Sequence, residues 1–294
     1  MRITNGMMSN NVMFNINQSY SRLETLFNQA QTQKKINRPS DDPVVAMKGM
    51  FYRTNVIEVE QYKRNFSEAY NWTESTDSAI DEATKALQRV RDLAVQVSND
   101  TYDEDQLKAV AEEINQLKTH IKTIANTKVG DKYIFNGTNT LHPPFANVDD
   151  AEPTFDTNDV RFELAKGIHV EVNMKGETVF GSGENSVFAI LDRLETALQT
   201  DGDEGITDFI DEIDVGLQQF LTARSEIGAR MNRLEFMEDR IDGQEVMAKR
   251  IMSDNEDVDF EKVVMDLKAQ EAIHTAAMAV GARIIQQTLM DFLR

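Results

Sequence analysis

The last 36 residues of the chain, 259–294, contain no proline and a single glycine, Gly281. Such an uninterrupted stretch predicts one helix of roughly 54 Å, at about 1.5 Å of rise per residue. Its apolar residues form two neighbouring rows, mostly at steps of three and four residues. The first row is Phe260, Val263, Leu267, Ile273, Ala277, Val280 and Ile284, and the second is Met278, Gly281, Ile285, Leu289 and Phe292. One antiparallel neighbour covers only one row, so the helix needs further cover from the chain or from other copies of it.

The first 35 residues supply a candidate partner for this helix. A coiled-coil seam, spaced by three and four residues in turn, runs through Met13, Ile16, Tyr20, Leu23, Phe27 and Ala30. We therefore expect the N-terminal and C-terminal helices to pair. Two such seams are also typical of an ordinary long helical bundle, and that alternative stays open at this point.

The charge of the chain excludes some classes of partner. Its formal net charge is -19, whereas binding to phosphate depends on clustered Lys and Arg, so we expect neither nucleic acid nor membrane as a partner. The charge is uneven: residues 1–38 carry five basic and one acidic side chain, and residues 141–214 carry 4 basic and 18 acidic ones. The middle of the chain is therefore expected to be solvated, in contrast to its ends.

The sequence contains no cysteine, which excludes disulfides and thiol chemistry. It has no apolar run of 18 residues, and its first residues lack the apolar core and cleavage site of a secretory signal. Taken alone, these features predict a soluble, cytosolic chain. Export routes that read an uncleaved N-terminus leave no such signature.

Along the chain, helix signals alternate with short strand signals. Pro39 and Pro43 predict a helix break and restart, with Asp41 or Asp42 as the cap. Long helices are expected from there to about 97 and from 107 to 124, as an antiparallel hairpin, and again over 187–199 and 206–252. Strands are expected over 133–137, 160–164 and 168–174, with turns at 166–167 and 175–176.

The predicted fold class is mainly α: a long antiparallel helical bundle or coiled coil formed by the N- and C-terminal halves, with a small β-rich insert at the tip. We expect a terminal helical domain (1–40 and 256–294), a helical rod domain (41–130 and 185–255) and a small outer insert (131–184). Arg224 and Glu238 interrupt an apolar seam of the rod, and we interpret them as side chains that set the register or snorkel.

The sequence lacks the residue patterns that are typical of catalytic and metal sites. His120, His142, His169 and His274 fall on different elements without the spacing of metal ligands. Residues 201–212 resemble a calcium loop but lack its oxygen ligand at position five and its glycine at position six. Gly181-Ser182-Gly183 is not followed by a nucleotide-binding pattern. We expect no enzyme activity, cofactor or metal.

Four stretches, in order, carry a resemblance to a known family. They are MRITNGMMSNN at the start, KINRPSDDP after the first helix, IANTKVGDKYIFNGTNTLHPPF before the insert, and RSEIGARMNRLE with DVDFEKVVMDLKAQEAIHTAAMAVGARIIQQTLMDFLR at the end. Together they resemble the hook-filament junction proteins (hook-associated protein 3) of the bacterial flagellin superfamily. Plain flagellins look like SAxDDAA where this chain has Arg38-Pro39-Ser40-Asp41-Asp42-Pro43, and the HPPF passage also favours the junction proteins.

The resemblance implies a structural adaptor that joins the flagellar hook to the filament and assembles through its terminal helices. The implied partners are other copies of the chain, the neighbouring hook-associated junction protein, flagellin and an export chaperone. It also implies an extracellular place in the flagellum, reached through the flagellar type III channel without a cleaved signal peptide. The expected assembly residues are Met13, Ile16, Tyr20, Leu23, Phe27, Ile273, Val280, Ile284, Ile285, Leu289 and Phe292.

Two alternatives remain at this stage: a flagellin that builds the filament itself, and a secreted coiled-coil binding protein that keeps its helices to itself. A further resemblance concerns residues 87–96, which look like the flagellin segment that the vertebrate innate receptor for flagellin recognises. Arg89, Arg91 and Asp92 would be its contacts, with Asp92 where flagellins usually have Glu. The same run is also simply a well-formed amphipathic helix.

Overall fold

The structure, a computed structural model, describes residues 5–98, 103–146, 153–200 and 205–292, and the side chains within these ranges from Met7 to Arg283 except that of residue 104. The chain forms two compact units. Unit 1 comprises Met1–Glu58 and Gln244–Arg294, and unit 2 comprises Val59–Gly243. Two long helices, α2 (Pro43–Val97) and α6 (Ile206–Glu256), contribute residues to both units. The three-domain division expected from the sequence stays a prediction.

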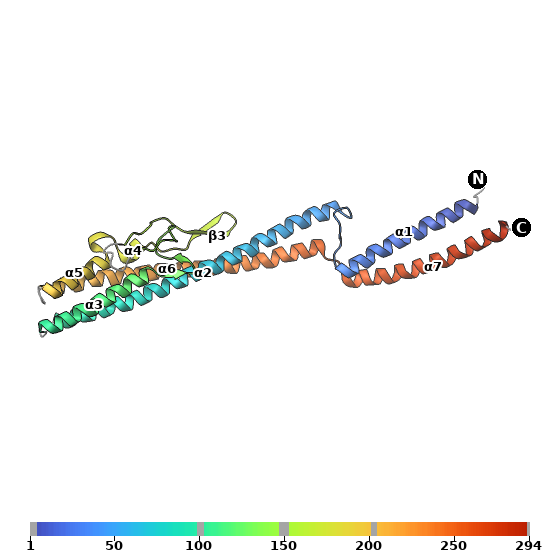
Figure 1. Cartoon of the computed structure of the whole chain (residues 1–294). Helices are drawn as coiled ribbons and strands as arrows, with labels where there is room; N and C mark the ends of the chain where they lie inside the picture. Colours follow the sequence, from blue (N-terminus) through green and yellow to red (C-terminus); the bar gives the residue numbers. More distant parts are fainter. Residues whose placement is uncertain (1–4, 99–102, 147–152, 201–204, 293–294) are drawn as a thin grey trace. The chain divides into compact units, whose positions relative to one another are not determined.

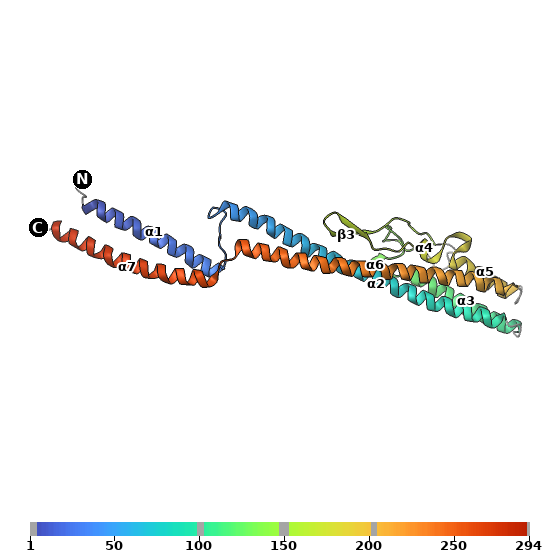
Figure 2. The same ribbon diagram turned by 180° about the vertical axis from the view of Figure 1, so that it is seen from behind.

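Unit 1 contains the two terminal helices as an antiparallel pair, as expected. Helix α1 (Asn5–Thr32) lies along helix α7 (Phe260–Phe292), and both ends of the chain lie at the same end of this pair (Figure 1). The view from behind shows the same arrangement (Figure 2). Pairing of Lys34 with Asp257 and of Ser19 with Gln270 gives the antiparallel direction.

The break after α1 is built from local hydrogen bonds. The chain leaves α1 at Gln33, which has a left-handed φ of 57°. Asp42 Oδ1 accepts the backbone N–H groups of Val44 and Val45 at 2.9 and 3.1 Å, so Asp42 is the N-cap of α2 and Pro43 opens its first turn. Asp41 instead accepts the backbone N–H of Arg38 at 2.9 Å and stabilises the linker.

Unit 2 is a helical bundle made of α2, α3 (Glu104–Ala125), α5 (Val187–Thr200) and α6 (Figure 1). The predicted hairpin of α2 and α3 is confirmed, because Arg89 pairs with Glu113 and Glu82 with His120 across it. Lys118 of α3 binds Asp192 of α5 at 2.7 Å. The largest fully buried side chains are six phenylalanines: Phe66, Phe135, Phe145, Phe180, Phe188 and Phe220.

The insert between α3 and α5 contains two small antiparallel hairpins. One joins β1 (Lys128–Val129) to β2 (Lys132–Tyr133), and the other joins β3 (Arg161–Ala165) to β4 (Ile168–Glu171). Short helices α4 (Gly176–Phe180) and η1 (Gly183–Asn185) follow. The predicted strand over 133–137 is wrong beyond its first residue, since residues 134–136 are buried in the core in irregular conformation. The predicted turn at 175–176 is the start of α4.

The two polar residues on the α6 seam have structural contacts. Arg224 binds Asp77 at 3.0 Å and Asp81 at 2.6 Å on α2. Burial and a hydrogen bond to Glu238 raise the pKa of Tyr70 to about 12. These contacts link α2 to α6 within unit 2 and support the register-setting interpretation.

Candidate assembly surface

Large apolar side chains that stay exposed gather in unit 1. Within the described residues there are 24 of them, and 19 belong to this unit, although it is the smaller of the two. Among the described side chains of unit 1, only three apolar ones are buried: Val56, Ala248 and Val263. A soluble monomer rarely exposes so much apolar surface on one part, so unit 1 has the character of a binding surface.

The inner seam of α1 differs from the expected one by one residue position. The residues that face α7 are Ser9, Val12, Ile16, Ser19, Leu23, Leu26 and Ala30, all buried or half-buried. Ile16, Leu23 and Ala30 belong to both seams. The sequence had predicted Met13, Tyr20 and Phe27 in this inner seam, but they are exposed by 50%, 60% and 56%, although the Tyr20 ring still lies beside His274 of α7. The spacing alone allows either seam, because both alternate steps of three and four.

The inner seam of α7, which faces α1, contains several small and polar residues. It consists of Val263, Leu267, Gln270, His274, Ala277 and Gly281. Gly281 allows a close approach of the helices, since a β-carbon there would lie 3.1 Å from side-chain carbons of both Ile16 and Val12. Because small and polar side chains bury little apolar surface, the contact between α1 and α7 contributes little stability by itself.

A polar layer crosses this seam near its middle. The side-chain amide of Gln270 donates to Ser19 Oγ at 2.9 Å and to the Ser19 carbonyl at 3.3 Å. His274 lies beside Tyr20, with ring centroids 6.0 Å apart, and its buried Nδ1 has no hydrogen-bond partner within the described residues. A polar layer of this kind fixes the alignment of two helices at a cost in stability.

The expected assembly residues thus divide into two groups. Ile16 and Leu23 pack inside the α1–α7 pair. Five others are each at least half exposed, and we call these five the outward residues: Met13, Tyr20, Phe27, Ile273 and Val280. The side chains of Ile284, Ile285, Leu289 and Phe292 lie outside the described residues.

A cluster of charges holds the break between α1 and α2 onto the end of α6. The buried carboxylate of Glu256 accepts two hydrogen bonds from the Arg53 guanidinium, at 2.7 and 2.8 Å, and lies 3.4 Å from Lys34. Lys34 also binds Asp257 at 2.6 Å, and this hydrogen bond holds the pKa of Asp257 below its usual range. Gly49 passes close to Glu256, because a β-carbon there would lie 2.8 Å from the carboxylate. Unit 1 therefore combines this polar cluster with its exposed apolar surface.

The three expected receptor contacts lie on α2 in unit 2. Arg89 pairs with Glu113 at 2.8 Å, and Arg91 pairs with Asp214 of α6, which lowers the pKa of Asp214. Asp92 is exposed. Both arginines therefore have contacts inside the bundle, and recognition by an innate receptor stays a prediction that a receptor reporter assay with the monomer can test.

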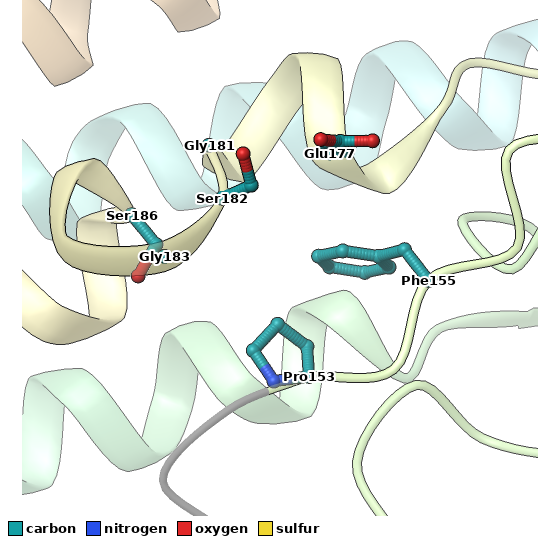
Figure 3. A pocket seen from close by; sticks show the side chains of 7 residues that line it. All are labelled: Pro153, Phe155, Glu177, Gly181, Ser182, Gly183 and Ser186. Carbon is teal, nitrogen blue, oxygen red and sulfur yellow. The ribbon is translucent and has the colours of Figure 1, made fainter.

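The described residues bring together no group of three His, Cys, Asp or Glu side chains that could hold a metal ion. A recess of about 230 Å³ lies in the insert (Figure 3), lined by Pro153, Phe155, Glu177, Gly181, Ser182, Gly183 and Ser186. Its lining has one carboxylate, and Ser186 Oγ already accepts the backbone N–H of Ala189. This recess does not contain the convergent acid, base and nucleophile that catalysis needs. No helix in the described part of the chain is both long and apolar enough to cross a membrane.

Comparison with known families matches both ends of the chain. The bacterial flagellin N-terminal helical region matches residues 3–140, and the bacterial flagellin C-terminal helical region matches residues 210–293. Together the two matches cover about three quarters of the chain. The chain belongs to the bacterial flagellin family.

Its relatives within that family are structural proteins of the flagellum. Flagellar hook-associated protein 3 of Escherichia coli (strain K12) is 24% identical, over 92% of this chain and 93% of its own length. A flagellin of Halalkalibacterium halodurans is 28% identical, over 94% of this chain and 92% of its own length. Bacillus cereus FlgL, whose crystal structure is known, is 25% identical in sequence and matches this structure with a TM-score of 0.59. The match covers 69% of this chain and 99% of the FlgL chain. The expected fold, with long terminal helices and a small β-containing insert, is thereby confirmed.

Proposed function

We propose that this chain is a structural adaptor subunit of the flagellum, which joins the hook to the filament and assembles through its terminal helices. The observation that carries the proposal is the concentration of exposed large apolar side chains on unit 1. Membership of the flagellin family and similarity to hook-associated protein 3 over almost the whole chain support it.

The spacing of the outward residues indicates how copies of the chain would contact one another. Met13, Tyr20 and Phe27 follow one another at intervals of seven residues, as do Ile273 and Val280. Seven residues make about two helical turns, so side chains at this interval lie on the same side of a helix. The outward residues therefore form one row on α1 and one row on α7. Other copies of the chain are the natural cover for these rows, because each copy brings the same rows to the contact.

The rival within the family is a flagellin that builds the filament itself, since relatives of both kinds match at similar identity. The segment Arg38-Pro39-Ser40-Asp41-Asp42-Pro43, which resembles the junction proteins, favours the adaptor. In this structure the segment forms part of the linker between α1 and α2, in which Asp42 caps α2 and Asp41 accepts the backbone N–H of Arg38. A secreted coiled-coil binding protein would instead bury its large apolar residues within its own helix pair.

Deletion of the gene distinguishes the adaptor from the filament subunit. We expect electron microscopy of the deletion strain to show hooks without filaments, with filament subunits shed into the medium, because flagellin would lack its attachment site. Complementation with the full gene is the control and restores the filaments. Hooks that still carry the other junction proteins, with no filament subunit in the medium, would show that the chain is the flagellin.

The proposal includes export to the outside of the cell through the flagellar channel without a cleaved signal peptide. The absence of cysteine suits a chain that travels unfolded, because no disulfide can form within it before export. Before export, the apolar rows of the C-terminal helix need cover against aggregation, and an export chaperone would provide it. A chain lacking residues 270–294 that bound every flagellar chaperone as tightly as the full chain would contradict this part.

A further inference from the structure

The methionines of this chain are divided between the two units by their exposure. Eight of the described methionine side chains are exposed, by 45% to 66%, and all eight belong to unit 1. We call these eight the exposed methionines: Met7, Met8, Met13, Met47, Met50, Met247, Met265 and Met278. The methionines of unit 2, in contrast, are buried or half-buried: Met174, Met231 and Met237. The fold therefore presents thioether groups to solvent in unit 1 and shields them in unit 2.

Methionine is over-represented on this surface relative to leucine. The exposed methionines are eight of the 19 exposed large apolar side chains of unit 1, whereas no leucine is exposed among the described side chains of this unit. Leucine has a similar volume and can usually replace methionine at small cost. Methionine differs from it in two properties, a more flexible side chain and a sulfur atom that oxidants attack. The second property gives unit 1 a chemistry that an apolar surface of leucine would lack.

An exposed thioether reacts with two-electron oxidants such as hydrogen peroxide. A lone pair of the sulfur attacks one peroxide oxygen, and the S–O bond forms as the O–O bond breaks. The proton of the attacked oxygen passes to the departing hydroxide, so the products are a sulfoxide and water. The sulfur loses two electrons and the peroxide gains them. Because the chain contains no cysteine, no thiolate in it competes for the oxidant.

A sulfoxide is polar, and its burial in an apolar contact is unfavourable unless it finds a hydrogen-bond donor. Met13 is itself one of the outward residues, and Met278 lies on α7 between Ile273 and Val280 in sequence. Oxidation at these positions replaces apolar groups of the assembly surface by polar ones. The shielded methionines of unit 2 keep their thioethers, so the core of that unit is unaffected.

We propose that the exposed methionines are a modification site for two-electron oxidants, and that their oxidation to sulfoxides prevents the unassembled chain from joining the flagellum. This role rests on the proposed function, because it requires that unit 1 assembles. The modification is reversible in principle, since the two classes of methionine sulfoxide reductase each reduce one epimer of the sulfoxide. Oxidation would therefore switch off assembly without destroying the chain.

The test uses three full-length proteins: the natural chain, a variant with Met→Leu at all the exposed methionines, and a matched control with Met174→Leu, Met231→Leu and Met237→Leu in unit 2. Each purified protein is treated with hydrogen peroxide, and peptide mass spectrometry measures the sulfoxide at every methionine. Co-sedimentation with flagella isolated from the deletion strain measures assembly. Each treated protein is compared with the same protein untreated, so that any effect of the substitutions themselves cancels.

We expect the exposed methionines of the natural chain to oxidise at least about tenfold faster than Met174, because access governs the reaction. Binding of the oxidised natural chain to the flagella should fall at least about tenfold, and treatment with both reductases should restore it. The control with substitutions in unit 2 should lose binding to the same extent as the natural chain. The variant without exposed methionines should keep its own untreated level of binding, and the thermal melting of unit 2 should stay unchanged in every treated protein.

Three results would overturn the proposal. Unchanged binding of a natural chain that carries sulfoxides at the exposed methionines would show that their oxidation does not affect assembly. A loss of binding that persists in the variant without exposed methionines, or that the reductases do not reverse, would assign the effect to other groups. If the untreated natural chain does not bind the flagella, the proposed function fails, and the modification has no assembly to prevent.

Discussion

Removal of Ile285 to Arg294 is expected to abolish assembly while the melting of unit 2 stays unchanged. Five large apolar side chains are lost, and the three of them that belong to the second apolar row, Ile285, Leu289 and Phe292, each contribute roughly 1.5 to 3 kcal/mol when fully buried. Together they supply about 5 to 9 kcal/mol per subunit, as an upper bound, because ordering the helix costs about 1 to 2 kcal/mol per residue. Unit 2 keeps its core, since all its helices precede the deleted segment.

Circular dichroism and thermal melting of the truncated monomer, together with complementation of motility in the deletion strain, measure the two effects separately. Unchanged melting with lost motility is the expected pair of results. The full-length chain with Leu221→Ser, a half-exposed residue of unit 2, is the matched control and should restore motility. A truncated chain that still restores filaments, or that loses its cooperative melt, would contradict the prediction.

The second large effect is expected in the core of unit 2. Phe180 is fully buried, and its ring lies 5.2 to 6.1 Å from the rings of four other phenylalanines: Phe135, Phe155, Phe188 and Phe220. The substitution Phe180→Ala should lower the free energy of unfolding by about 3 to 5 kcal/mol, because it removes apolar contacts and leaves a cavity. For a unit of this size, that loss lowers the Tm by roughly 6 to 20 °C.

Thermal melting followed by circular dichroism measures this change. Phe236→Ala on α6 is the matched control: the same chemical change at a side chain that is 75% exposed, for which about 0.5 kcal/mol or less is expected. Equal melting temperatures for the two variants would contradict the prediction that the buried Phe180 ring stabilises unit 2.

The helices could be predicted from the sequence because their signals are long and local. Absence of proline, a regular apolar period and a cap at Asp42 are enough to place α2, α6 and α7. The insert was less predictable, because strands of two residues have no period to detect. Residues 134–136 look like a strand but are buried by contacts with distant helices, which no local pattern contains.

The assembly residues show a different limit. The sequence identifies Met13, Tyr20 and Phe27 as apolar at heptad spacing, and it places the largest apolar residues between α1 and α7. The structure places the smaller Val12, Ser19 and Leu26 there instead. Heptad spacing fixes which residues share a side of a helix, but it does not show whether that side faces the same chain or another one.

The central claim is that the terminal helices depend on other copies for their stability, and hydrogen exchange tests it most directly. In the isolated monomer, we expect the backbone amides of α1 and α7 to exchange far faster than those of α3, because the small and polar seam between α1 and α7 buries little. In assembled flagella the same amides should become protected. Protection of α1 and α7 in the monomer equal to that of α3 would contradict the account.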